Sequence, residues 1–406
     1  MPDTNIARHP LARIDPFAPF ARLARRTART GCRAAQARPR SGQVAHSTIK
    51  VEHMAGLFQS PSFGAIRRVA ALLLAGCVTI AQAQPSEKSA GIDLIGINMS
   101  GANFAPHITP GKVGTNYFYP EKKYFQYYAQ KNIRLIRFPF IWERLQHDLH
   151  KGLNFDQIRL LRRTLDYAAQ HDQKVILDMH NYARYKGKLI GSKQVPYEAY
   201  ANVWRKLAQT FKDHPALLGY DIMNEPHSTD GLWPAAAQAA VDAIRQVDMN
   251  TLIFVEGDRW ASTFHWRYVN EDFLIEDPAG KLVYEGHLYF DKDFSGRYAR
   301  DETVDPMLGV ERVRPFVEWL QEHNLKGFVG EYGVPGHSES MLVAMDNMLG
   351  YLNEHCIPSA YWAGGPGWGK YVLAIEPIDG KDRPQMDVLQ KHIANDCTQY
   401  GPTPRP

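Results

Sequence analysis

From residue 91 onward, short apolar runs alternate with longer amphipathic segments, and the alternation repeats eight times. Strands that alternate with helices predict a parallel sheet whose crossovers are helical. The runs expected to be strands are 92–98, 133–140, 174–179, 218–223, 252–256, 282–288, 327–330 and 359–362. Helical periodicity marks segments such as 155–171, 196–213, 233–247, 310–323 and 338–355, and a last one at 384–396.

Eight such units over about 320 residues fit one closed (β/α)8 barrel, whose usual size is about 250 residues plus insertions. A doubly wound open sheet is the alternative, but the G-x-G-x-x-G turn that marks its cofactor site does not follow the first run. We therefore predict the α/β class and a (β/α)8 TIM barrel that forms a single domain over residues 84–400. A flexible tail is expected at 401–406, and no appended binding module is expected.

Positive charge is concentrated ahead of this domain. Residues 1–83 carry twelve Lys or Arg against three acidic residues, a net charge of +9, whereas the remaining 323 residues have a net charge of −5. The overall charge of +4 therefore does not indicate an anionic partner, and we expect no nucleic acid to bind.

A short apolar run preceded by Arg67 and Arg68 and followed by small residues at 81–83 has the order of a secretory signal peptide. We interpret 54–83 as this signal and 1–53 as an over-extended or unstructured leader. The chain is then expected to be secreted, without a transmembrane span in its mature form, and monomeric. The segment Leu74–Cys77 also resembles a bacterial lipobox, so lipidation of Cys77 is an alternative.

Beyond residue 83 the cysteines are Cys356 and Cys397. In an oxidising compartment the two can pair, and the bridge would tie the C-terminal helix to the segment before the last strand. Unpaired burial stays open as the other interpretation.

Polar residues that follow each apolar run are the candidates for chemistry, because the active site of such a barrel forms where its strands end. These residues are Asn103, Arg137, His180, Asn224, Glu225, Glu256, His287, Tyr289, Glu331 and Trp362. Glu225 and Glu331 lie in short turns after the fourth and seventh strands, which stand across the barrel mouth from each other. Two opposed carboxyl groups suit cleavage of a glycosidic bond, since one protonates the departing oxygen and the other meets the charge at the anomeric carbon. Tyr289 is placed to hydrogen-bond Glu331 and hold it ionised.

Five motifs in this order resemble glycoside hydrolase family 5, from residue 91 to about 396. They are Arg137-Phe138-Pro139-Phe140, Asp178-Met179-His180-Asn181-Tyr182, Met223-Asn224-Glu225-Pro226, His287-Leu288-Tyr289 and Gly330-Glu331-Tyr332-Gly333. The extended patterns at 180–185 and 287–291 are similar to bacterial and fungal endoglucanases of that family. The segment 363–369 departs from the family pattern.

The resemblance implies a retaining endo-β-1,4-glucanase that acts on cellulose-type polysaccharides without a cofactor. Glu225 matches the acid/base and Glu331 the nucleophile, and their carboxyl groups should stand about 5 to 5.5 Å apart. The residues that match those around the sugar are Arg137, His180, Asn224, His287, Tyr289 and Trp362. Two alternatives stay open: a sister specificity for β-mannan, xyloglucan or mixed-linkage glucan, and a non-catalytic glycan-binding lipoprotein.

Other polar and aromatic residues have simpler explanations. Glu143, Glu256, Asp258 and Glu285 are expected to be solvated or paired, and Arg137 has the alternative of a structural ion pair. Asp178 with His180 could form a metal pair, but no His-x-His follows the first strand, so no metal is expected. Trp204, Trp233 and Trp319 are expected to pack, whereas sugar stacking and burial are both open for Trp142, Trp260, Trp266 and Trp368.

Overall fold

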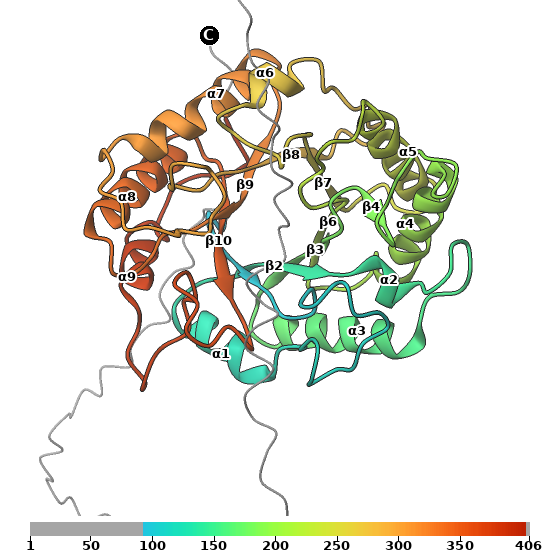
Figure 1. Ribbon diagram of the computed structural model, residues 1–406, viewed down its shortest axis with the longest axis horizontal. Coiled ribbons are helices and arrows are strands. Elements are labelled where there is room, and N and C mark those ends of the chain that lie inside the picture. Colours follow the sequence, from blue (N-terminus) through green and yellow to red (C-terminus); the bar gives the residue numbers. More distant parts are fainter. Residues whose placement is uncertain (1–91, 403–406) are drawn as a thin grey trace, which may run out of the picture. The chain divides into compact units, whose positions relative to one another are not determined.

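The computed structural model describes residues 92–402. Within this part of the chain, eight parallel strands close into a barrel in the order β1-β10-β9-β8-β7-β6-β3-β2, and helices surround it (Figure 1). The barrel strands are β1 (Ile95–Met99), β2 (Leu135–Phe140), β3 (Lys174–Met179), β6 (Leu217–Asp221), β7 (Leu252–Glu256), β8 (Leu282–His287), β9 (Gly327–Tyr332) and β10 (Ser359–Gly364). The predicted (β/α)8 barrel is confirmed.

Each barrel strand is followed by at least one helix. The helices are α1 (Lys122–Gln130), α2 (Trp142–Leu145), α3 (Phe155–Ala169), α4 (Tyr197–Phe211), α5 (Trp233–Arg245), α6 (Trp266–Asn270), α7 (Leu308–Glu322), α8 (Glu339–Glu354) and α9 (Pro384–Lys391). A small hairpin of β4 (Arg184–Tyr185) and β5 (Lys188–Leu189) lies in the loop after β3. The helix α3 begins at the expected residue, where the side chain of Asn154 accepts a hydrogen bond from the Gln157 amide at 3.0 Å.

The barrel interior changes from apolar to charged along the strands. A cluster of buried side chains fills its lower part, namely Leu135, Ile176, Phe254, Val283, Phe328 and Ala360. Side chains two residues apart on a strand point the same way. The residues two positions after the first four of these are Arg137, Asp178, Glu256 and Glu285, all fully buried. A charged layer therefore lies directly below the barrel mouth.

The C-terminal segment closes the opposite end of the barrel. Cys356 and Cys397 form a disulfide with their Cα atoms 5.6 Å apart. The Ile92 amide donates to the Cys397 carbonyl at 2.7 Å, and the Gly327 amide, at the start of β9, donates to the Gly401 carbonyl at 2.7 Å. These contacts join both ends of the described chain to the base of the barrel.

No helix among the described residues is long and apolar enough to cross a membrane. The predicted leader, the signal peptide and Cys77 all lie outside the described residues.

Candidate active site

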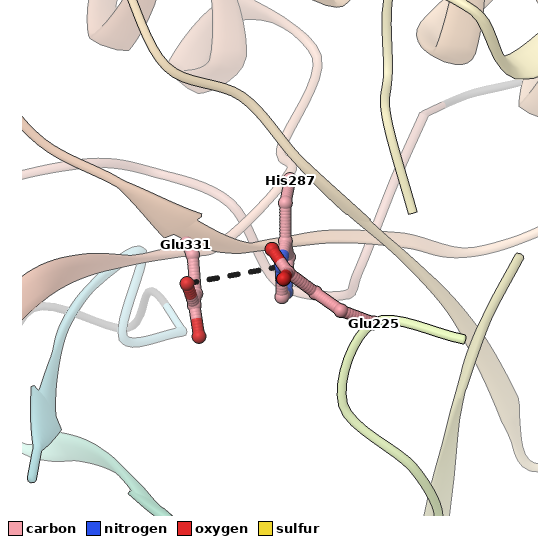
Figure 2. Close-up of side chains that lie close together, drawn as sticks. All are labelled: Glu225, His287 and Glu331. Carbon is pink, nitrogen blue, oxygen red and sulfur yellow. Dashed lines mark hydrogen bonds and ion pairs between the residues drawn. The ribbon is translucent and has the colours of Figure 1, made fainter. Parts of the chain in front are cut away.

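Glu225, His287 and Glu331 converge at the barrel mouth from the loop after β6, the end of β8, and β9 (Figure 2). The Nδ1 atom of His287 lies 3.1 Å from Oε1 of Glu225 and 3.9 Å from Oε2 of Glu331. One oxygen of each glutamate and one ring nitrogen of His287 all lie within 4.8 Å of one another. The structure thus brings together the two carboxyl groups that the strand ends predicted to face each other.

The backbone of Glu225 has a φ of 47°, in the left-handed region that residues with a side chain seldom adopt. Its amide donates a hydrogen bond of 2.6 Å to Oε2 of Glu256, which is fully buried at the end of β7. This contact fixes the turn that aims the Glu225 side chain at the mouth.

Glu331 is surrounded by donors. Nη1 of Arg137 donates to its Oε1 at 3.0 Å, and the hydroxyl of Tyr289 donates to its Oε2 at 2.8 Å. Burial raises the pKa of Glu331, whereas Arg137, His180 and Tyr289 act to lower that pKa. The negative charge of this carboxylate is therefore stabilised directly by Arg137 and Tyr289.

Glu225 has a different environment. Burial raises its pKa well above the ordinary value, and the charge of Glu331 raises that pKa further. Its carboxyl group contacts His287, whose own pKa is lowered far below normal by burial, so the imidazole is neutral. Of the two carboxyl groups, Glu225 is the one suited to carry a proton and Glu331 the one suited to be an anion.

Arg137 has no exposed surface. Its guanidinium forms ion pairs of 2.7 to 3.0 Å with five carboxylates, which are Asp178, Asp221, Glu256, Glu285 and Glu331. It also donates to Oδ1 of Asn224 at 3.0 Å. Arg137 was expected at the sugar, but its complete burial means that it acts on the site through Glu331 and Asn224.

His180 and Trp362 form a second wall of the site. Their rings stack with centroids 5.5 Å apart and an interplanar angle of 10°. Nδ1 of His180 lies 2.8 Å from Oδ2 of Asp178, and burial lowers the pKa of His180 to about 4. Asp178 is also paired with Arg137. The sequence left Asp178 and His180 as a possible metal pair, but in the structure Asp178 orients the imidazole of His180.

The structure separates the remaining tryptophans by exposure. Trp204, Trp233 and Trp319 are buried as expected, and so are Trp142 and Trp266. Trp260 is 47% exposed and stacks on His227 with centroids 4.6 Å apart. Trp368 is half-buried and stacks on Tyr371 at 4.7 Å. Sugar stacking is therefore available to Trp260 and Trp368.

Several candidates hold loops in place. Asn103 accepts hydrogen bonds from the Ser100 hydroxyl and the Gly101 amide in the loop after β1. Glu143 accepts from the Asn181 side chain and from the Lys186 amide. Asp258 accepts from the Thr229 hydroxyl. Glu143, Asp258, Glu256 and Glu285 are thus all paired or hydrogen-bonded.

The sequence did not predict that the buried acidic residues and Arg137 form one charged layer. Asp221 was not a candidate, and Glu256 and Glu285 were expected only to be solvated or paired, whereas both are fully buried beside His287. The signal that could have found them is an acidic residue inside an apolar run on four consecutive barrel strands. An isolated acid there has to be paired, and Arg137 is the cation at the matching depth.

Two sets of described side chains bring oxygen and nitrogen atoms within 4.8 Å of one another, as a metal ion requires: Glu225, His287 and Glu331, and Glu256, Glu285 and His287. In both sets, Arg137 already pairs with at least one of the carboxylates, and its positive charge opposes a bound cation. The donor atoms suit proton transfer better than metal binding.

A (β/α)8 barrel with two glutamates at its mouth, one suited to carry a proton and one held as an anion, defines a glycoside hydrolase. The chain belongs to glycosyl hydrolase family 5: the cellulase model of that family matches residues 86–367. The family expected from the motifs is confirmed.

Solved and curated relatives agree with this assignment. The structure of Pseudomonas stutzeri endoglucanase Cel5A in complex with cellobiose is 69% identical, with a TM-score of 0.78 over 79% of this chain and 98% of that chain. An endo-beta-1,4-glucanase from Xanthomonas axonopodis pv. citri is 34% identical, with a TM-score of 0.72 over 75% of this chain and 99% of that chain. Endo-beta-1,4-glucanase B of Aspergillus niger is 32% identical over 79% of this chain and 98% of its own length.

Proposed function

We propose that the chain is a secreted endo-β-1,4-glucanase that hydrolyses internal bonds of cellulose-type polysaccharides with retention of configuration. One observation carries the proposal: an oxygen of Glu225 and an oxygen of Glu331 lie within 4.8 Å of each other. Inverting enzymes need about 6.5 to 9.5 Å between their carboxyl groups to admit a water molecule, whereas retaining enzymes need only about 5 to 5.5 Å. The short separation supports direct attack by one carboxylate.

The first step uses the two different environments. The Glu331 carboxylate attacks the anomeric carbon, the bond from that carbon to the departing oxygen breaks, and the Glu225 proton moves to that oxygen. In the second step a water molecule attacks the same carbon, gives its proton to Glu225, and releases Glu331. Glu225 therefore ends each cycle protonated, as it began, with a proton that comes from water.

The remaining site residues are proposed to bind and orient the sugar. Nδ2 of Asn224 has no hydrogen-bond partner among the described residues, which supports a hydrogen bond from it to a substrate hydroxyl. The aromatic face of Trp362, backed by His180, suits stacking on a pyranose ring. Tyr289 and His287 hold the two carboxyl groups, and the names of the relatives support glucan as the polymer.

Secretion and a monomeric state are part of the same proposal. The Cys356–Cys397 disulfide supports an oxidising compartment, because disulfides are rare in the cytosol of mesophiles. The signal-like segment at 54–83 points the same way. Recovery of the protein from the culture medium would test secretion, and its sedimentation as a single chain would test the monomeric state.

A parallel assay on carboxymethylcellulose, glucomannan and mixed-linkage glucan tests the specificity. We expect a rapid fall in the viscosity of carboxymethylcellulose. We also expect the new reducing ends to have the β configuration, which NMR can detect before mutarotation. Faster cleavage of glucomannan or mixed-linkage glucan would assign a sister specificity. Release of α-configured ends would contradict retention, and absence of reducing sugar from all three polymers would indicate a glycan-binding protein.

A further inference from the structure

His287 connects the mouth of the barrel to its charged interior. Nδ1 of its ring lies 3.1 Å from Oε1 of Glu225, whose side chain is 16% exposed. Nε2, on the other edge of the ring, lies 3.3 Å from Oε1 of Glu285 and 3.4 Å from Oε1 of Glu256. Both inner carboxyl groups are fully buried, and their oxygens lie within 4.8 Å of each other. The ring thus contacts both the partly exposed carboxyl group of Glu225 and the buried pair of Glu256 and Glu285.

The charges around this ring do not balance if every acid is ionised. The titratable and charged groups packed around it come from six strands or the loops after them: Arg137, His180, Glu225, Glu256, Glu285 and Glu331. Arg137 also pairs with Asp178 and Asp221, so one guanidinium serves five carboxylates. Both histidines are neutral, because burial lowers the pKa of each. Some of the acids must therefore keep a proton.

Glu285 and Glu256 are the acids best placed to do so. Asp178 and Glu331 each have a donor besides Arg137, in His180 and Tyr289, and Asp221 contacts the guanidinium through two nitrogens. Glu285 and Glu256 differ from these acids in that Oε1 of each faces Nε2 of His287, at 3.3 and 3.4 Å. Oε2 of Glu285 has no hydrogen-bond partner among the described residues, as is also true of Oδ1 of Asp178 and Oδ1 of Asp221. Burial raises the pKa of both Glu256 and Glu285 well above the ordinary value, and neighbouring acids raise it further.

We propose that Glu256 and Glu285 hold one proton between them and pass it through His287 to Glu225, a role that rests on Glu225 being the acid/base of the proposed function. In this step a carboxylic acid of the pair gives its proton to Nε2 of His287, and Nδ1 gives its own proton to the Glu225 carboxylate. The imidazole stays neutral and changes tautomer, the pair becomes fully ionised, and Glu225 becomes the acid. No other reactant is needed.

The pair therefore acts as a proton store that sets the ionisation of the acid/base. Within one catalytic cycle Glu225 recovers its proton from water, so the store is not consumed. It acts when Glu225 loses its proton to solvent, because the buried pair can then replace that proton. The consequence is activity that persists to a higher pH than Glu225 alone would allow.

The variants Glu256→Gln and Glu285→Gln test the store through the pH dependence of kcat/KM on cellopentaose. We expect the alkaline limb of each profile to move to lower pH by about one unit, since removing a neighbouring acid has that order of effect. Glu143→Gln is the matched control: Glu143 is also buried near the mouth and accepts two hydrogen bonds, but they come from Asn181 and Lys186. A purely structural role would lower the height of the profile without moving its alkaline limb. We expect the control variant to leave the alkaline limb in place in the same way.

An alkaline limb that stays in place, or moves to higher pH, in both folded variants would overturn the proposal. Should neither variant fold, ¹⁵N NMR of the histidine-labelled wild-type protein decides the question. We expect His287 to remain neutral while its proton moves from Nδ1 to Nε2 with rising pH, as the pair loses its proton. A single tautomer throughout would refute the store. The NMR measurement needs no substrate, so it is separable from a failure of the glucanase assay.

Discussion

At the scale of single residues, replacing Glu225 by its amide and replacing Glu331 by its amide should impair different steps of the reaction. We expect Glu225→Gln and Glu331→Gln each to lower kcat on cello-oligosaccharides by about 10²-fold or more, because each removes a group that acts in the transition state. An aryl cellobioside with a good leaving group needs no protonation. Glu225→Gln should therefore still release a burst of the aryl group in stopped-flow measurements, and Glu331→Gln should not.

The control for this pair is Glu354→Gln, at the exposed end of α8, which should leave both steps unchanged. Near-normal cellopentaose hydrolysis by either active-site variant would refute the assigned roles. A burst from Glu331→Gln but not from Glu225→Gln would exchange them.

Gly330 makes room for the charged layer. A Cβ atom at this position would lie 1.6 Å from Oε1 of Glu285, a side chain that is fully buried and paired with Arg137. We expect Gly330→Ala to lower the free energy of unfolding by about 1 to 3 kcal/mol or more, through displacement of Glu285. Urea denaturation measures this loss. Gly152→Ala is the control, because a Cβ there meets no atom within 4 Å, and equal stability of the two variants would contradict the argument.

At the scale of secondary-structure elements, the sequence predicted all eight barrel strands, because short apolar runs that alternate with helical patterns leave few other folds. Their ends moved by up to three residues, as at β1, which begins at Ile95. The helices α1, α2 and α6 were not predicted, and α2 and α6, with four and five residues, are too short to show a helical period. The two glutamates at the mouth were predictable from strand ends, but the interior ion pairs depend on strand register, which periodicity does not specify.

The loop between β10 and α9 is held by one buried carboxyl group. Glu376 accepts hydrogen bonds from the Tyr128 hydroxyl on α1, at 2.6 Å, and from the Gly365 amide just after β10. Burial raises its pKa from 4.5 to about 7. The carboxyl therefore resists ionisation in the folded state, although it ionises readily in the unfolded chain.

The raised pKa of Glu376 makes the stability of the folded state decrease as the pH rises. Below about pH 4.5 the group is protonated in both states, and as the pH rises to 7 the folded state progressively loses stability relative to the unfolded chain. Glu376→Gln removes this loss. We expect the stability of the variant relative to wild type to improve between pH 4 and pH 8 by on the order of 3 kcal/mol, measured by urea denaturation. Glu354→Gln should show no such trend, and a constant difference between Glu376→Gln and wild type would contradict a raised pKa.

At the scale of the whole barrel, the active site and the C-terminal segment that covers the base lie at opposite ends. The site occupies the carboxyl ends of the strands, whereas Tyr400 packs against the apolar cluster at the base. The Gly401 amide donates to the Cys356 carbonyl at 2.8 Å, next to the disulfide. Stability contributed at the base should therefore be separable from activity at the mouth.

Replacing both cysteines tests this separation. The disulfide closes a loop with a sequence separation of 41 residues, and the chain-entropy model assigns about 4 kcal/mol to a loop of that length. We expect Cys356→Ser/Cys397→Ser to lower the free energy of unfolding by about that amount in urea, while kcat/KM on cellopentaose at 25 °C stays within about twofold of wild type. Wild-type protein reduced with dithiothreitol is the control and should match the variant. A folded variant with wild-type stability would show that the bridge contributes little, and one that has lost activity would show that the base and the mouth are coupled.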